Sequence, residues 1–230
     1  MIPKEFKKKL GGNRLLILGE IHGAESNPRV INDFVKSFGI RSILIEVESR
    51  HKKAFGFLKN GNPKRFLKAL KKDNWIFDAG VVGAAHLKLF QNYLKKGINI
   101  IPAKIESRNW NAAESKTARN IEKILAKIGS RGPALLVFGR LHARKTNFRL
   151  NRKSYKPLGA LLRDNAVSIG IHYGRGEVFN FRKIKIKDEN IKKFISKGAK
   201  GLTASNNRYF DYFYIIPNTK AIKLVKYPLS

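Results

Sequence analysis

Five short aliphatic runs constrain the fold of this 230-residue chain more than any other feature of its sequence. Each run is too short for a typical helix and is apolar almost throughout, which is typical of strands covered on both faces of a sheet. Such runs predict five strands, and they occupy Arg14–Leu18, Ser42–Val47, Ile98–Ile101, Ala134–Phe138 and Ala166–Ile171.

Segments with helical periodicity separate these runs. Apolar residues recur at helical spacing from Val30 to Phe38, after Asn27-Pro28, and along one stripe from Trp110 to Ile128. Further helical segments are expected near residues 52–58, 63–70, 81–94, 157–162 and 191–195. Because alternating strands and helices form βαβ crossovers, we expect an α/β fold with a mainly parallel sheet and helices on both faces.

The C-terminal part of the chain departs from this alternation. Tyr209–Ile216 and Ala221–Val225 are expected to form a hairpin turned at Pro217-Asn218, which would add an antiparallel edge to the sheet. Pro102 is expected to close the third strand, and Tyr173–Gly176 to form a turn after the fifth. Since no internal repeat or linker interrupts residues 1–230, we expect one α/β domain.

The charge of the chain is strongly unbalanced. Lysine and arginine number 48 against 16 acidic residues, which gives a formal net charge of +32. Such a surface attracts nucleic acid, anionic lipid and other polyanions. The lysines are dispersed, however, without the fold signatures of dedicated nucleic-acid readers. Two interpretations stay open: solvated lysine-rich faces, or polyanion contact through the lysine-rich surface.

The chain has no cysteine, which excludes a disulfide framework, a thiolate zinc site and a thiol nucleophile. The apolar run Leu15–Leu18 is shorter than a signal-peptide core, and no stretch approaches the roughly 20 residues that a membrane span needs. We therefore expect no transmembrane segment and a cytoplasmic location. The sequence indicates no oligomeric state.

Acidic and histidine side chains follow three of the predicted strands where each strand ends. Glu20 and His22 follow the first strand, Glu46 lies at the end of the second, and His142 comes three residues after the glycine that ends the fourth. The carboxyl ends of parallel strands meet at one edge of a sheet, where such folds place their sites. We therefore expect these four side chains to form one catalytic site.

These residue types suit two kinds of chemistry. A histidine beside a carboxylate can take a proton from water near neutral pH, because the carboxylate fixes its tautomer and stabilises the imidazolium. Two imidazoles and two carboxylates, here His22, His142, Glu20 and Glu46, also suit a divalent metal with open positions for water. The alternative is that the acids are strand-end caps and the histidines bond to backbone carbonyls.

Three further residues are candidates for substrate binding. Arg108 follows the third strand, where it either holds an anionic group or an oxyanion or is an ordinary surface arginine. Asp78, after Trp75, is expected at the same mouth. His86 lies on the apolar stripe of its helix, where it is either a core histidine or part of the pocket wall. The sequence lacks the motifs of serine hydrolases and nucleotide-binding enzymes, which disfavours both classes.

The order of these motifs resembles a known superfamily. Gly19-Glu20-Ile21-His22-Gly23, then Glu46, then Gly139-Arg140-Leu141-His142, and the late strand Phe210–Pro217 look like the superfamily that joins ChaN-like haem-uptake proteins, erythromycin esterase and the TraB/Tiki proteins. Arg140 stands where we expect a small polar residue in that pattern. The resemblance spans nearly the whole chain and implies an EreA/ChaN-like fold.

The resemblance also implies roles. Glu20 and His22 match the family's first acid-histidine motif, Glu46 its strand-two acid, and His142 its second histidine motif. Esterase members are taken to hydrolyse esters without metal, Tiki-like members are described as metal-dependent proteases, and ChaN-like members bind haem. Haem is less expected here, because the sequence shows no lipoprotein signal of the kind that exported haem-uptake members carry.

The leading hypothesis is therefore a hydrolase-like protein in which a His/Glu pocket activates water, with or without a metal. Its substrate would be a small-molecule or peptide ester, amide or phosphate. The alternative hypothesis is a non-catalytic protein that binds haem or a polyanion through its basic surface.

Overall fold

The computed structural model describes residues 2–12, 14–70, 75–129, 132–188, 191–196, 200–205 and 207–223. Its centre is a sheet with the strand order β3-β2-β4-β1-β7-β10-β9, to which β8 adds through β7. The first six strands of this order are parallel to one another, whereas β9 and β8 are antiparallel to their neighbours. The fold class predicted from the sequence, an α/β fold with a mainly parallel sheet, is confirmed.

The strands coincide closely with the aliphatic runs. Every residue of β1, β2 and β4 is buried, as expected for strands that are covered on both faces. The parallel strands are β1 (Leu15–Glu20), β2 (Ser42–Glu48), β3 (Asn99–Lys104), β4 (Ala134–Gly139), β7 (Ala166–Asn180) and β10 (Tyr212–Thr219). The antiparallel strands are β8 (Arg182–Lys187) and β9 (Gly201–Ala204), and β5 (Phe148–Leu150) and β6 (Lys153–Tyr155) form a separate hairpin.

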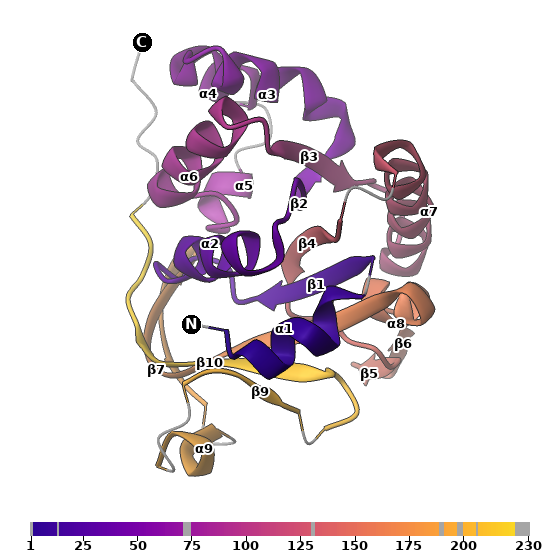
Figure 1. Cartoon of the computed structure of the whole chain (residues 1–230), viewed down its shortest axis with the longest axis vertical. Helices are drawn as coiled ribbons and strands as arrows, with labels where there is room; N and C mark the ends of the chain where they lie inside the picture. Colours follow the sequence, from indigo (N-terminus) through magenta and orange to yellow (C-terminus); the bar gives the residue numbers. More distant parts are fainter. Residues whose placement is uncertain are drawn as a thin grey trace.

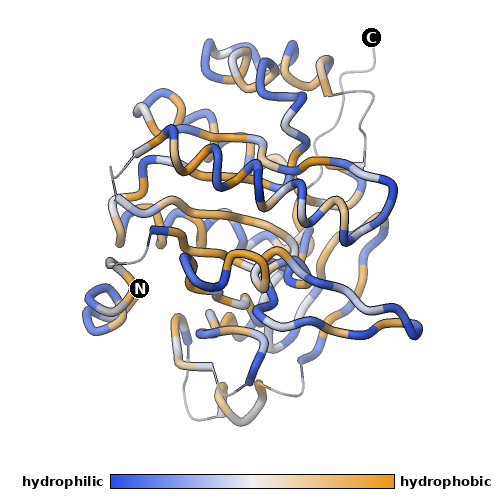
Figure 2. Tube along the Cα trace, turned by 90° about the vertical axis from the view of Figure 1, so that its right-hand side faces the viewer, coloured by the Kyte–Doolittle hydropathy of each residue, from blue (hydrophilic) through white to orange (hydrophobic). Residues whose placement is uncertain are grey.

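Helices cover both faces of the sheet (Figure 1). One apolar core lies against α1 (Lys4–Gly11), α2 (Asn27–Phe38), α3 (Lys52–Lys59), α4 (Pro63–Leu70), α5 (Trp75–Asp78) and α6 (Ala84–Lys95). The other core lies against α7 (Trp110–Ile128), α8 (Leu158–Leu161) and α9 (Lys192–Ser196). Figure 2 shows the consequence, with apolar strands inside and polar outer turns. Within the described residues, each helix is too short or too polar to cross a bilayer.

Three local expectations were wrong. The third strand continues through Pro102 to Lys104, because β3 lies at the edge of the sheet, where a missing N–H breaks few ladder bonds. Tyr173–Gly176 is not a turn but part of the 15-residue β7. The antiparallel edge exists, but the strand that pairs with β10 is β9, and Pro217 and Asn218 lie within β10.

The remaining differences concern residues that the structure does not describe and elements that the sequence did not predict. Ala221 forms an isolated bridge with Ala24, and residues 224 and 225 of the expected last strand lie outside the described residues. Helix α1, helix α5, the β5–β6 hairpin and strand β8 were not expected from the sequence. The single domain over residues 1–230 and the cytoplasmic location stay predictions.

Gly23 joins three segments just beyond the first strand. Its N–H donates to the carbonyl of Gly80, and its own carbonyl accepts from the N–H groups of Phe179 and Ile222, at 2.9, 3.0 and 2.8 Å. Its φ is +77°, and a Cβ at this position would collide with the carbonyl group of Phe179. Only glycine therefore fits this crossing without a shift of the backbone.

We expect the substitution Gly23→Ala to destabilise the protein by about 3 kcal/mol or more, since it adds a backbone collision to an unfavourable φ. Gly39→Ala is the matched control, because Gly39 has a φ of +62° with nothing near its Cβ position, so the loss should be about 1 kcal/mol. Chemical denaturation measures both. Equal losses would contradict the role of the Gly23 crossing.

Candidate active site

The carboxyl ends of β1, β4 and β2 lie side by side in the sheet. The register places Glu20 of β1 opposite Gly139 of β4, and Ile45 of β2 opposite Val137 of β4. Glu20 and Glu46 therefore flank the end of the strand that leads to His142. The structure brings together all four residues that the sequence analysis assigned to one catalytic site, although their chemical roles remain predictions.

His22 lies between the two predicted carboxylates. Its Nδ1 is 3.1 Å from Oε1 of Glu20, and its Nε2 is 3.4 Å from Oε2 of Glu46. The imidazole is 17% exposed, whereas the side chains of Glu20 and Glu46 are 2% and 4% exposed. The ring thus stands at the surface of the site, with the acids beneath it.

Glu46 is the centre of the site. Its Oε2 accepts the backbone N–H of Gly139 at 2.7 Å, and its Oε1 accepts from Nζ of Lys104 at 3.2 Å. Its Oε1 also lies 3.4 Å from Nε2 of His142. One buried carboxylate therefore faces two imidazoles, an ammonium group and a backbone donor.

Gly139 makes this arrangement sterically feasible. A Cβ at residue 139 would lie 2.9 Å from Nε2 of His22 and 3.3 Å from Oε2 of Glu46. A side chain there would push both groups away from the end of β4. The glycine that ends the fourth strand thus brings the backbone close to the reactive groups.

His142 has a second acid of its own. Its Nδ1 is 2.8 Å from Oε1 of Glu114, whose Oε2 accepts the N–H of Leu158 at 2.8 Å. The ring of Trp110 stacks on the imidazole, with 5.2 Å between centroids and 19° between planes. This side of the site is therefore held by α7, which carries both Trp110 and Glu114.

Sequence reasoning missed Glu114 and Lys104. Glu114 follows Trp110 by four residues and precedes Thr117 by three, so an acid on the apolar stripe of α7 was the signal that could have revealed it. Lys104 was missed because the third strand was expected to end earlier. Its Nζ also lies over the ring of Trp75, 4.1 Å from the centroid.

The carboxylates raise the pKa of both histidines. Burial alone would lower the pKa of His22, but the hydrogen bond to Glu20 and the contact with Glu46 outweigh it and raise the pKa to about 9. Burial is likewise outweighed at His142, where the charge of Glu46 and the hydrogen bond to Glu114 raise the pKa to about 10. Both imidazoles are therefore protonated at neutral pH, not neutral as the sequence analysis assumed.

The two central acids shift in opposite directions. Burial raises the pKa of Glu20 and outweighs the hydrogen bond to His22. At Glu46 burial also acts to raise the pKa, but the charge of His142 and the hydrogen bonds from both histidines hold it well below its usual range. Glu46 is thus the permanent anion of the site, and Glu20 is the stronger base.

The three predicted substrate-binding residues occupy different positions. His86 is 1% exposed, packs against Phe90 and lines a small internal cavity with Glu20 and Glu46, so it is both a core histidine and a wall of the site. Burial lowers the pKa of His86 to about 3 and keeps it neutral. Arg108 is exposed on a depression of about 570 Å³ that also includes Lys104 and Trp110.

Asp78 lies apart from these contacts. It is the exposed last residue of α5, and its backbone carbonyl accepts the N–H of Phe181 at 2.6 Å. Within the described residues, no contact joins its carboxylate to the His/Glu cluster. We therefore leave Asp78 out of the candidate site.

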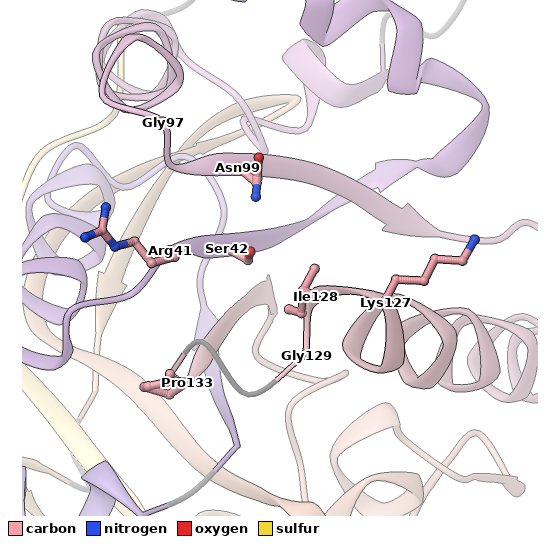
Figure 3. A pocket seen from close by; sticks show the side chains of 9 residues that line it. Arg41, Ser42, Gly97, Asn99, Lys127, Ile128, Gly129 and Pro133 are labelled. Carbon is pink, nitrogen blue, oxygen red and sulfur yellow. The ribbon is translucent and has the colours of Figure 1, made fainter.

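A second cavity, of about 780 Å³, lies at the opposite ends of the strands. Its lining includes Ser42 at the start of β2, Asn99 at the start of β3 and Pro133 just before β4 (Figure 3). The cluster of carboxylates and imidazoles lies at the other edge of the sheet. The size of this cavity does not make it the site of chemistry.

The residues do not fit the divalent metal that the sequence analysis considered. The lone pairs of Glu46 already accept from Gly139 and from the ammonium of Lys104, whose charge opposes a cation. In the described ranges, no set of three or more histidine or acidic side chains is arranged to hold a metal ion.

Known structures with the same arrangement of elements identify the fold. A mutant of erythromycin esterase EreC in its open conformation is 10% identical, with a TM-score of 0.64, and the match covers 96% of this chain and 95% of that one. The chain has the erythromycin esterase fold. At this identity the likeness extends to the fold alone.

Two other solved structures share the erythromycin esterase fold. A protein from Bacillus cereus is 12% identical with a TM-score of 0.62, and the match covers 97% of this chain and 93% of that one. A succinoglycan biosynthesis protein is 13% identical with a TM-score of 0.61, and the match covers 96% and 92%. No protein-family model and no curated protein sequence matches the chain.

We expect Glu114→Gln to lower the pKa of His142 by more than one unit, because it removes the carboxylate that contacts Nδ1. The pKa of His22 should stay near 9, since Glu20 and Glu46 remain. Glu122→Gln is the control, as Glu122 is exposed on the same helix. NMR titration of the imidazole protons measures these values. An unchanged pKa of His142 in E114Q would contradict this assignment.

Proposed function

We propose that the chain hydrolyses an ester, with His22 as the general base and His142 as the oxyanion donor. The observation that carries this proposal is the single buried carboxylate of Glu46 between two imidazoles, each of which has a second carboxylate at its Nδ1. Imidazoles that carboxylates orient in one site are candidates for proton transfer and for stabilising negative charge. The shared fold with erythromycin esterase supports a hydrolase reaction.

His22 is the base in this proposal, since Glu20 holds its Nδ1 and fixes its tautomer. In its neutral form Nδ1–H donates to Glu20, which leaves Nε2 to take a proton from water. The water oxygen then attacks the ester carbonyl carbon. With a pKa of about 9, roughly 1% of His22 is neutral at pH 7. Most molecules are therefore inactive at neutral pH until the proton leaves.

His142 keeps its proton and stabilises negative charge. Its imidazolium, held by Glu114 and stacked on Trp110, presents Nε2–H on the side of Glu46. A carbonyl oxygen that becomes negative in the tetrahedral intermediate can accept this hydrogen bond. When the intermediate collapses, the alkoxide leaves and takes the proton that His22 received. The products are a carboxylic acid and an alcohol.

A binding role for haem has less support. The carboxylates raise the pKa of both imidazoles, and a protonated imidazole has no lone pair to give to iron. Polyanion binding through the lysine-rich surface remains a prediction. Affinity for DNA or anionic vesicles that falls steeply with salt and does not depend on His22 would be its signature.

We expect His22→Asn to lower kcat/KM for p-nitrophenyl acetate by at least about 100-fold, the usual contribution of a general base. His142→Asn should cause a loss of similar size. His51→Asn is the control, because His51 lies outside the cluster, and it should leave the rate unchanged. Circular dichroism checks that the variants fold. Wild-type rates in H22N would contradict the proposal.

The pH profile tests the assignment of base and oxyanion donor. Since His22 must be deprotonated, kcat/KM should rise about tenfold per pH unit from pH 7 and level off near 9. Since His142 must be protonated, the rate should fall above about 10. The profile, corrected for spontaneous hydrolysis, should thus have its maximum in the alkaline range. A plateau that begins near pH 6.5 would contradict the raised pKa of the base.

We expect activity to survive removal of metal ions, because Lys104 and Gly139 already engage the central carboxylate. Dialysis against EDTA followed by the same assay measures this. The rate should stay within about twofold of the untreated protein, and reconstitution with zinc or manganese should not raise it. Loss on dialysis with recovery on adding one metal would overturn the metal-free mechanism.

A further inference from the structure

A basic depression of about 500 Å³ lies next to the His/Glu cluster. Its lining includes Ile21, which stands between Glu20 and His22, and Arg140, which directly follows Gly139. The backbone N–H of Arg140 donates to the carbonyl of Glu20 at 2.7 Å. The depression therefore begins within one residue of the reactive groups on both strand ends.

Arg140 is the feature that points to a ligand. Its Nη1 is buried and makes no hydrogen bond to the described residues, although its side chain as a whole is 33% exposed. The nearest acid, Asp188, lies 3.6 Å from Nη1, which is an ion pair without a hydrogen bond. The guanidinium group at the depression thus has one nitrogen, Nη1, without a hydrogen-bond acceptor among the described residues.

The neighbours of Arg140 do not neutralise the depression. Asp188 also accepts from Nδ1 of His172 at 2.8 Å, so its carboxylate is shared. Burial, and then the charge of Arg140, lower the pKa of His172, which is therefore the neutral partner in this contact. Strand β8 adds the exposed Lys185 to the lining, so that among the described lining residues Arg140 and Lys185 both lie near Asp188.

We propose that Arg140, with Lys185, binds an anionic group of the substrate, a carboxylate or a phosphate, beside the bond that is cleaved. This inference rests on the proposed ester hydrolysis and specifies its substrate class: an ester that carries an acidic substituent close to the reactive carbonyl. The planar fork of arginine matches both oxyanions, since it can donate two parallel hydrogen bonds. Arg140 would then determine specificity, whereas His22 and His142 perform the chemistry.

The depression around Arg108 is the weaker anion site. Lys104 on that side is already paired with Glu46 and lies over Trp75, and the lining contains the acid Glu106. Trp110 gives it an aromatic wall next to His142. The two depressions thus differ in charge and in apolar surface. The group bound at Arg140 is the anionic one.

Two matched esters test the assignment by rate. p-Nitrophenyl pentanoate is neutral, and the p-nitrophenyl monoester of glutarate carries a free carboxylate at the end of an acyl chain with the same number of carbons. We expect the wild type to have at least about tenfold higher kcat/KM for the anionic ester. Arg140→Gln should reduce this preference to about one. Lys183→Gln makes the same change of charge on β8 outside the depression and should keep the preference.

Binding without turnover separates this inference from the proposed function. In the inactive variant H22N, millimolar glutarate or inorganic phosphate should still raise the melting temperature. The shift should vanish in the double variant H22N/R140Q and persist in H22N/K183Q. Comparing glutarate with phosphate shows which oxyanion the site prefers. If R140Q does not fold, Lys185→Gln replaces it, with the same direction of change.

The outcomes divide clearly. A thermal shift that depends on Arg140 but not on Lys183 supports the anion site even if neither ester is hydrolysed, in which case only the proposed hydrolysis fails. Three results would overturn the inference: the same thermal shift in H22N/R140Q as in H22N/K183Q, loss of the shift in both double variants, or no shift in H22N itself. Hydrolysis of both esters with no preference in the wild type would overturn it as well, while leaving the proposed hydrolysis intact.

Discussion

The site depends on one buried anion, the carboxylate of Glu46. An isolated carboxylate at this depth would be costly, because burial strongly disfavours the charged form. The N–H of Gly139, the ammonium of Lys104 and the two imidazoles together supply the compensation. These donors come from three separate segments, which follow β1, end β3 and end β4, so the carboxylate links parts of the chain that are remote in sequence. A neutral side chain in its place would remove a charge that raises the pKa of both histidines.

The parallel sheet brings these residues together. Register between β1, β4 and β2 fixes Glu20, Gly139 and Glu46 at one edge without any long loop. His22 and His142, which follow strand ends, and Trp110 and Glu114 on α7 complete the site. Glu20 and Glu46 thus lie on strands that are buried on both faces, whereas His22 and His142 lie just beyond strand ends. The exposed part of the site is thus limited to the imidazoles and the neighbouring depressions.

The sequence predicted the frame better than the details, for identifiable reasons. Aliphatic runs and helical stripes revealed the strands and the larger helices, because burial imposes those periodicities directly. The positions of Glu20, His22, Glu46 and His142 followed from the rule that sites lie beyond strand ends. Glu114 was missed because it comes from the middle of a helix, and its contact with His142 depends on how α7 packs. Strand β8 was missed because its lysines are typical of a solvated segment, and its strand conformation depends on pairing with β7.

The net positive charge of the chain and the carboxylates of the site have opposite effects on the pKa values of His22 and His142. A field from a net charge of +32 would by itself favour loss of protons from His22 and His142. Salt screens such a field over about 8 Å, however, whereas the carboxylates lie 2.8–3.4 Å from the imidazole nitrogens. The local acids therefore determine the protonation of the site, and the distant lysines affect mainly the approach of charged molecules. That field would attract an anionic ester, which would then contact Arg140 in the basic depression. The surface charge and the proposed substrate class therefore have a common physical basis.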